Sequence, residues 1–237
     1  LLGHLSLRDK DYTATMRLGV STVTDDAEGD VTSTTDASGI DDAAILAAMA
    51  RQTGEIQQVP TAVSAIKING QRAYAKVRAG EDVVLQPRAV TVSRFEATET
   101  RRHDEMIDVD VEVTCSSGTY VRALARDVGA DLGVGGHLTA LRRTRIGPFD
   151  LTAACPDIFA DDAGAPAPMT MAEAARLSFP VVEVTDDQEA AIRVGRRVDM
   201  IVPADVTAMI AGTGEMLALY RPDDERRGQS RAICVLV

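Results

Sequence analysis

The sequence predicts an α+β protein, in which a mixed, mainly antiparallel sheet is flanked by helices and followed by a small β-barrel. Stretches that alternate apolar and polar residues, as half-buried strands do, recur before residue 150. Other stretches carry apolar residues at helical spacing, and Asn69-Gly70 is a hairpin-type turn. After Pro180 the chain changes to short apolar runs, a pattern typical of small barrels. Hairpin signals beside separate helices favour α+β over a doubly wound sheet.

Four segments of the first part are predicted strands. In "MIDVDVEVTC" apolar residues from Ile107 to Val113 alternate with acidic ones, and "DYTATMRLG" alternates in the same way from Tyr12 to Leu18. "PRAVTVSRFEAT" and "HLTALRRTRIGPF" are the other two. The segment "AVSAIKINGQRAYAKVRAG" is expected to form a strand, the Asn69-Gly70 turn and a short helix that ends at Gly80.

Two longer helices are predicted between these strands. "IDDAAILAAMARQTG" has acids in its first turn and an arginine near its end, with Gly54 as the stop. The helix that follows Gly118 buries Val121, Leu124 and Val128 and ends at Gly133. The acidic stretch "TDDAEGDVTSTTDASG" is expected to be a loop.

The chain is expected to contain two domains, residues 1–179 and 180–237. "DDAGAPAPMT" is its most linker-like stretch, and the helical segment "MAEAARLSF" follows it. From Pro180 onward, "VVEV", "VTAMI", "EMLALY" and "RAICVLV" are short predicted strands, with one helix, "DQEAAIRVG", among them. These segments make up the predicted barrel.

Composition excludes several classes of protein. With 45% hydrophobic and 26% charged residues among 237, the chain has an ordinary globular composition, and no apolar run approaches the roughly 20 residues of a membrane span. The three cysteines are far apart, no C-x-x-C pair occurs, and the three histidines do not cluster. We therefore expect no metal site and no disulfide framework, and a reducing, cytoplasmic setting.

The net charge of −11 argues against a protein that coats nucleic acid through bulk positive charge. Basic residues are nevertheless concentrated in two segments. Residues 66–88 contain five basic and two acidic residues, and residues 122–145 also contain five and two. An anionic partner is therefore compatible with the sequence, although such a charge run can also be a solvated face.

The segment "CSSGTYVRALARDVGADLG" (115–133) joins a predicted strand to a predicted helix and places Tyr120 and Arg122 in the first helical turn. Two interpretations remain open from the pattern alone. Tyr120 could pack in the core while Arg122 pairs with a surface acid. Alternatively, Arg122 could pair with a buried carboxylate while Tyr120 shapes a flat pocket. A guanidinium suits the second task because it stays charged when desolvated and binds carboxylates in a two-pronged way.

Three segments resemble the TruB family of tRNA pseudouridine-55 synthases, in the order of that family. "CSSGTYVRALARDVGADLGVGGHLTALRRTRIGPF" is similar to its C-S-x-G-T-Y-[IV]-R segment and the following L-R-R-T stretch. "DKDYTATMRLGVSTVTDDAEGDV" resembles its K-x-Y strand and T-D-T-x-D-x-x-G loop, and "GEIQQVPTAVSAIKINGQRAYAKVRAGEDV" its Q-x-P-P segment. The tail is similar to the small RNA-binding barrel of the PUA type.

The resemblance implies a domain (1–179) that makes pseudouridine in the T-arm of tRNA, followed by a PUA-like RNA-binding domain (180–237). It implies no cofactor and no metal, and we expect a monomer. Tyr12 would stack on the flipped base and take part in removing its C5 proton. Arg122 would pair with the catalytic aspartate, while Tyr120 and Leu141 would line the pocket. A thumb-like insertion of about residues 60–88 would bind phosphates through Lys67, Arg72 and Lys76, and Arg142 and Arg143 would add to the same face.

One departure bears on activity. The G-H-x-G-x-L-D-P-x-A-x-G motif, which carries the family's catalytic aspartate, is absent from residues 1–237 and is expected upstream of Leu1. Thr61 and Val63 stand where a proline and an aromatic residue are common in the family. The alternatives are therefore a noncatalytic RNA-binding or tRNA-folding protein on the same scaffold, a synthase acting on another RNA, and an α+β domain that does not bind RNA.

Overall fold

The computed structural model describes residues 1–61, 67–68, 71–72, 85–154 and 167–236. The chain divides into two compact units, Leu2–Thr152 and Ala153–Val237. Each unit has its own cluster of buried hydrophobic residues. The two units are therefore described separately.

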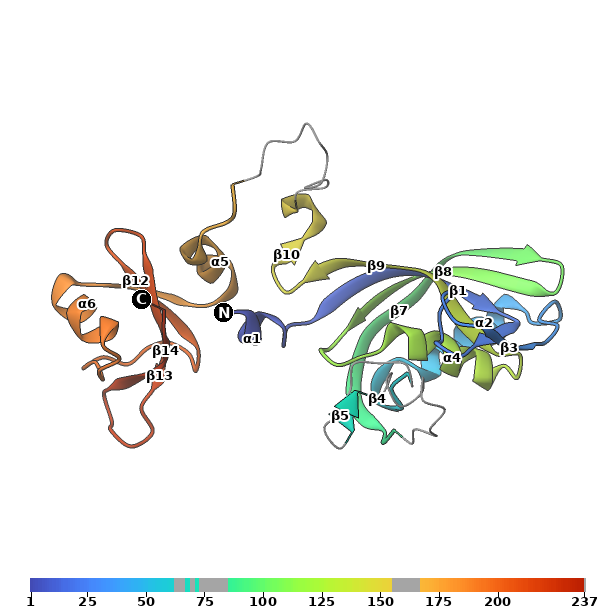
Figure 1. Cartoon of the computed structure of the whole chain (residues 1–237), viewed down its shortest axis with the longest axis horizontal. Coiled ribbons are helices and arrows are strands. Elements are labelled where there is room, and N and C mark those ends of the chain that lie inside the picture. Colours follow the sequence, from blue (N-terminus) through green and yellow to red (C-terminus); the bar gives the residue numbers. More distant parts are fainter. Residues whose placement is uncertain (62–66, 69–70, 73–84, 155–166, 237) are drawn as a thin grey trace. The chain divides into compact units, whose positions relative to one another are not determined.

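The first unit is built on a six-stranded sheet of order β10-β9-β1-β8-β7-β4. Every neighbouring pair in it is antiparallel, as predicted, and its long strands are strongly twisted (Figure 1). The central strand β1 pairs with β8 along its whole length, from Lys10 opposite Cys115 to Leu18 opposite Ile107. The strands are β1 (Lys10–Leu18), β4 (Gly54–Gln58), β7 (Arg88–His103), β8 (Met106–Cys115), β9 (Gly136–Ile146) and β10 (Phe149–Asp150).

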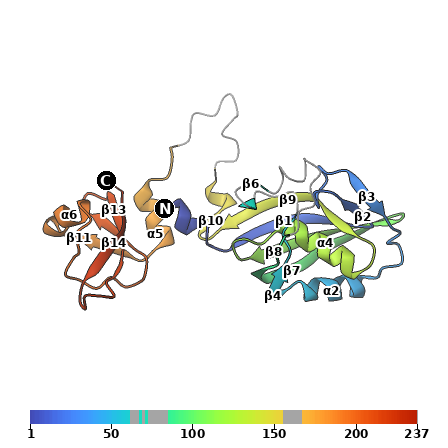
Figure 2. The same cartoon turned by 60° about the horizontal axis from the view of Figure 1, so that its bottom comes forward.

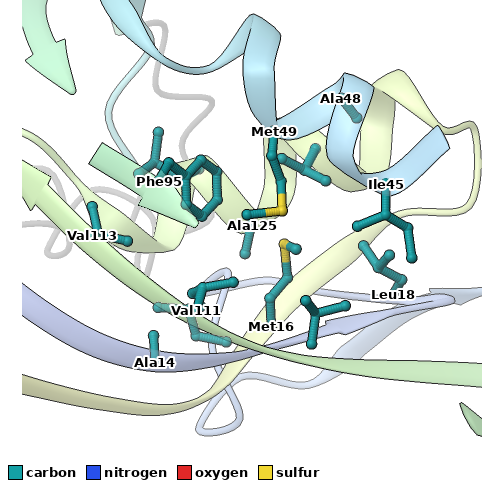
Figure 3. Packing of buried hydrophobic residues seen from close by; sticks show 14 of the residues in the cluster. Ala14, Met16, Leu18, Ile45, Ala48, Met49, Phe95, Val111, Val113 and Ala125 are labelled. Atoms are coloured by element: carbon teal, nitrogen blue, oxygen red, sulfur yellow. The ribbon is translucent and has the colours of Figure 1, made fainter. Parts of the chain in front are cut away.

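Two helices, α2 (Asp42–Arg51) and α4 (Val121–Asp131), pack on one face of this sheet (Figures 1 and 2). The side chains of Met16 on β1 and Met49 on α2 point toward each other in the core between them, and both are almost completely buried (Figure 3). Asp41 caps α2 by accepting a hydrogen bond of 2.7 Å from the Ala44 N–H. Both helices were predicted, and Ile45 and Met49 face inward on α2 as expected, but Leu46, also expected to point inward, is 53% exposed.

The opposite face of the sheet is polar. Arg17 donates two hydrogen bonds of 2.7 Å to the carboxylate of Asp108, and Arg101 pairs in the same two-pronged way with Asp110. Thr15 donates a third hydrogen bond, of 2.7 Å, to Asp110. This face explains why polar and acidic residues alternate with the buried valines of β8.

Several small elements were not predicted. The helix α1 (Leu2–Leu5) precedes the sheet, and β2 (Val20–Thr22) pairs with β3 (Val31–Thr34), which lies inside the segment expected to be a loop. All four residues of β3 are exposed, so its sequence lacks the apolar–polar alternation from which a half-buried strand can be predicted. The strands β5 (Lys67–Ile68) and β6 (Gln71–Arg72) pair antiparallel. A strand was expected before Asn69-Gly70, whereas β6, which follows it, was not predicted. The helix expected before Gly80 lies outside the described residues.

The second unit contains a four-stranded sheet of order β11-β12-β13-β14, comprising β11 (Val181–Val184), β12 (Thr207–Ala211), β13 (Met216–Pro222) and β14 (Ser230–Val235). The helices α5 (Met171–Ser178) and α6 (Asp186–Arg193) accompany it, and a one-turn 3-10 helix, η1 (Leu151–Ala153), lies where the two units meet in sequence. The predicted closed barrel is not confirmed, because no pairing between β11 and β14 is present in the described part of this unit.

The division at Ala153 lies upstream of the predicted boundary at 179/180. The cause is α5, which packs against β12 and β13 and therefore belongs to the second unit. Ala175 on α5 is completely buried, and Phe179, which follows the helix, is 8% exposed. Among the described residues, no helix has the length and apolar character needed to cross a membrane.

Candidate active site

The joint between β8 and α4 positions the predicted site residues. β8 ends at Cys115, and Gly118 has a φ of +91°, a conformation that favours glycine in the turn that follows. Tyr120 is the N-cap residue of α4, with extended backbone and no capping hydrogen bond from its own side chain. Arg122 therefore lies in the first turn of the helix, as predicted.

Gln58, the last residue of β4, makes hydrogen bonds to the joint between β8 and α4. Its side chain is buried, with the residue 2% exposed, and its amide makes two hydrogen bonds to the backbone of Tyr120. The Tyr120 N–H donates to Oε1 at 2.8 Å, and Nε2 donates to the Tyr120 carbonyl at 3.1 Å. Gln58 was not predicted as a site residue, although it lies in the segment that resembles the Q-x-P-P motif.

Arg122 forms an ion pair with Asp26, a residue of the acidic loop. Its Nη1 lies 2.6 Å from Oδ2 of Asp26 and donates a second hydrogen bond, of 3.1 Å, to the carbonyl of Thr24. The other carboxylate oxygen, Oδ1, accepts hydrogen bonds from the Thr24 hydroxyl at 2.5 Å and the Glu28 N–H at 3.1 Å. Both oxygens of Asp26 are therefore engaged.

The expected carboxylate partner of Arg122 was an aspartate from upstream of Leu1, whereas the partner that the structure shows lies within the chain. Asp26 was not predicted as a site residue, although its loop resembles the T-D-T-x-D-x-x-G motif. The motif carries an acidic residue at a fixed place, and from it Asp26 could have been identified as a candidate. Asp26 is 96 residues from Arg122 in sequence. Because the two residues are far apart in sequence, their pairing becomes evident only in the folded structure.

The acidic loop is fixed to the rest of the unit at several points. The Leu138 N–H of β9 donates to the carbonyl of Asp25 at 3.1 Å, and Asp25 adopts a positive φ of 58°. The carboxylate of Asp25 lies 3.2 Å from Nη1 of Arg126 on α4. A second nitrogen of Arg126, Nη2, donates to the carbonyl of Val59 at 2.7 Å. Arg126 thus connects the acidic loop, α4 and the residue after β4.

The two neighbouring aspartates differ in electrostatics. Burial disfavours ionisation of Asp26, but hydrogen bonds from Thr24 and Arg122 outweigh it and hold its pKa below the ordinary value. Burial raises the pKa of Asp25 above its ordinary value, and the nearby charge of Arg126 only partly opposes this effect. The carboxylate beside Arg122 is therefore the more firmly ionised of the two.

A pocket of about 440 Å³ lies beside the ion pair. Arg122 and Leu141, both predicted to belong to the site, line it together. Leu141 is 48% exposed, so its side chain is accessible from the pocket. The remaining lining comes from the acidic loop and from β9, namely Asp26, Ala27, Glu28, Leu138, Thr139 and Ala140.

Tyr12 lies on the same sheet face as Leu141. It pairs with Arg143 across β1 and β9, and its neighbour on that face, Ala14, pairs with Leu141. Tyr12 is half-buried, and burial raises the pKa of its hydroxyl, an effect that the Arg143 guanidinium opposes. The hydroxyl is therefore protonated near neutral pH.

Arg142 and Arg143 were expected on one face, but the structure places them on opposite faces of the sheet. Side chains alternate along a strand, and Arg142 pairs with Thr13 while Arg143 pairs with Tyr12. Arg142 lines a groove with Thr13, Thr15 and Asp110 on the polar face. A single surface formed by both arginines is therefore not supported.

Lys67 and Arg72 pair opposite each other in the β5–β6 ladder. Lys76 lies outside the described residues. Within the described part of the chain, no three metal-binding side chains gather in one place.

Comparison with known proteins relates this geometry to a family. Residues 1–121 match the N-terminal domain of TruB family pseudouridylate synthases, and residues 122–157 match the C-terminal domain of tRNA pseudouridylate synthase B. The chain is 84% identical, over 237 residues, to tRNA pseudouridine synthase B of Cutibacterium acnes, covering all of this chain and 80% of that protein. It is 50% identical, over 239 residues, to tRNA pseudouridine synthase B of Rhodococcus jostii, covering 76% of that protein.

Solved structures have the same fold. A chain of a Cbf5-Nop10-Gar1 complex matches with a TM-score of 0.59 at 25% identity, over 98% of this chain and 66% of that one. A chain of an H/ACA RNP bound to a substrate RNA containing 2'-deoxyuridine matches with a TM-score of 0.55 at 24% identity, over 97% of this chain and 65% of that one. This chain thus spans about two thirds of each neighbour's length. By its domain matches and its identity to curated relatives, the chain belongs to the TruB family of pseudouridylate synthases.

Proposed function

We propose that this protein converts uridine to pseudouridine in the T-arm of tRNA, as the names of its relatives indicate. The observation that carries the proposal is the Arg122–Asp26 ion pair beside a pocket lined by Leu141, in a chain 84% identical to a tRNA pseudouridine synthase B. The pair sets a fixed positive charge next to a space that can receive a base. The fold alone would not favour this activity over simple RNA binding.

The reaction is an isomerisation. The bond from the ribose C1' to N1 of the base breaks, a bond from C1' to C5 forms, the C5 proton leaves and N1 regains a proton. Atoms and charge balance within the nucleotide, so the chemistry requires neither a cofactor nor a redox partner. The base must first leave its stack, which costs a few kcal/mol, and must then be held by stacking and edge contacts. Leu141 and Tyr12 offer apolar and aromatic surfaces for this purpose. Tyr120, expected in the pocket, is not among the residues that line it beside the ion pair.

The nucleophile is proposed to be an aspartate outside residues 1–237, because the G-H-x-G-x-L-D-P motif does not occur within them. Arg122 would contact this aspartate as well as Asp26. The positive charge of Arg122 would keep the nucleophile ionised in a poorly solvated pocket.

Phosphate contacts would position the RNA. We assign these contacts to Lys67, Arg72 and Lys76 of the segment 60–88, together with Arg143, which lies on the sheet face of Tyr12 and Leu141. Such contacts orient RNA while the flipped base supplies selectivity. The C-terminal unit would add RNA binding of the PUA type. The enzyme is proposed to act as a monomer in the cytoplasm.

The test uses the full-length protein and a T-arm stem-loop, with pseudouridine formation and RNA affinity measured in parallel. Replacing Arg122 by Ala should abolish most turnover while most RNA affinity remains, because loss of the charge raises the pKa of the nucleophile. Arg122→Lys should fall between Ala and wild type, since lysine keeps the charge but loses the planar guanidinium that contacts both Asp26 and the Thr24 carbonyl. Arg51→Ala, which removes an exposed arginine paired with Asp131, is the matched control. Binding without product in the wild type would instead support the noncatalytic alternative.

A further inference from the structure

Gln58 is a buried amide whose two functional atoms both bind the backbone of one residue, Tyr120. The distances are 2.8 Å from the Tyr120 N–H to Oε1 and 3.1 Å from Nε2 to the Tyr120 carbonyl. A residue that is only 2% exposed and uses both ends of its side chain on a neighbouring segment is fixed in orientation. The carbonyl and N–H of Tyr120 are in turn fixed relative to β4.

The first turn of α4 depends on this contact. Helices usually begin with a side chain that caps the exposed N–H groups, but Tyr120 makes no such bond with its own side chain. Its carbonyl already accepts the N–H groups of Ala123 and Leu124. The Gln58 amide therefore supplies from another strand the anchoring that a local cap supplies elsewhere.

Arg122 lies two residues beyond this anchor, and its Nη1 reaches Asp26 at 2.6 Å. A shift of the first turn of α4 would move the Arg122 guanidinium away from Asp26 and from the proposed nucleophilic aspartate. Misplacement of a catalytic group by about 1 Å can cost about 10²-fold in rate. One turn further along α4, Arg126 binds the Val59 carbonyl at 2.7 Å, so the end of β4 is attached to two successive turns. Of these two attachments, that of Gln58 is the nearer to Arg122 in sequence.

We propose that Gln58 is a positioning residue of the synthase, which sets the place of Arg122 through the backbone of Tyr120. This inference rests on the proposed function. It adds a residue on β4 whose side-chain amide touches neither the RNA nor the reacting atoms, and whose effect on turnover passes entirely through α4.

The variants are made in the full-length protein. Gln58→Met keeps the size of the side chain and removes both hydrogen bonds, whereas Gln58→Glu keeps an acceptor for the Tyr120 N–H but sets a carboxylate oxygen against the Tyr120 carbonyl. Gln57→Met is the matched control, because Gln57 is the adjacent residue of β4 and is exposed. We expect kcat to fall about 10- to 10²-fold in both Gln58 variants, with RNA affinity within about threefold of wild type. If Gln58→Met does not fold, the kcat of Gln58→Glu tests the proposal in its place.

A double-mutant cycle separates positioning from general support of the fold. In the Arg122→Lys background, where the guanidinium and its contact with Asp26 are already lost, Gln58→Met should lower kcat less than about threefold. Equal losses in both backgrounds would show that Gln58 acts independently of Arg122 and would overturn the proposal. A Gln58→Met enzyme with the same kcat as Gln57→Met would also overturn the proposal. The same holds for a Gln58→Met enzyme in which only the RNA affinity falls. A wild-type enzyme that forms no product would instead reject the proposed function itself.

Discussion

At the scale of single residues, the site depends on contacts between segments that are far apart in the chain. Arg122 was predicted to need a carboxylate, and the motif around it was sufficient to identify its helix turn. Its partner Asp26 and the anchoring amide of Gln58 lie 96 and 62 residues from the positions they contact. A single sequence shows no periodicity that links such positions, so only the fold reveals which acid and which amide are used.

Tyr12 illustrates how burial changes the role of a residue. Its raised pKa keeps the hydroxyl protonated near neutral pH, so that removal of the C5 proton would require the hydroxyl to pass on its own proton. Tyr12→Phe keeps the stacking ring and removes the hydroxyl. If the hydroxyl takes part in proton transfer, this variant should bind RNA normally and turn over about 10² to 10⁴ times more slowly. Single-turnover measurement of pseudouridine with saturating enzyme gives the rate.

Tyr12→Leu, which removes both ring and hydroxyl, is the companion variant. It should lose stacking as well, and base stacking on an aromatic side chain is worth about 1–3 kcal/mol. A Phe variant with full activity would leave Tyr12 as a stacking platform only, and the proton acceptor would then have to be sought elsewhere.

At the scale of elements, the regular strands and helices were predictable because one face of each is buried. β8 was expected at "MIDVDVEVTC" and is observed as Met106–Cys115, with its valines packed under α2 and α4. β3 escaped prediction because all its residues are exposed, so no apolar residues mark an inner face. The separation of Arg142 from Arg143 follows from strand alternation, which was available from sequence once the strand was recognised.

The β5–β6 ladder carries the main prediction about RNA contact. Changing Lys67, Arg72 and Arg143 together to Ala should weaken T-arm binding and lower the slope of log affinity against log salt by about two to three, as expected for three lost phosphate contacts. The control triple variant replaces Arg51, Arg94 and Arg102, which are exposed and already paired with carboxylates. Fluorescence anisotropy of a labelled stem-loop at several salt concentrations measures both quantities. Unchanged affinity and slope in the first variant would show that this surface does not contact the RNA.

At the scale of the whole molecule, the acidic net charge and the RNA-binding proposal are compatible because the charges are segregated. Screening at physiological salt acts over about 8 Å, so a basic segment can attract phosphate although the chain carries a net charge of −11. The two units also have separate cores, one around β1 and β8 and one around β13. The RNA binding proposed for the second unit can therefore be tested apart from the first unit, which contains both Arg122 and the proposed phosphate-binding residues.

The last prediction concerns residues 1–237 as a polypeptide. We expect it to bind a T-arm stem-loop and to form no pseudouridine, since neither aspartate near α4 is suited to attack. Both oxygens of Asp26 are already held, by Arg122 on one side and by Thr24 and Glu28 on the other. Asp25 is buried, which raises its pKa, and its carboxylate already lies 3.2 Å from Nη1 of Arg126. Mass spectrometry of RNA incubated with excess protein gives the result, with the full-length enzyme as the positive control. Product from residues 1–237 would place the nucleophile within them, and Asp26→Asn and Asp25→Asn would then identify it.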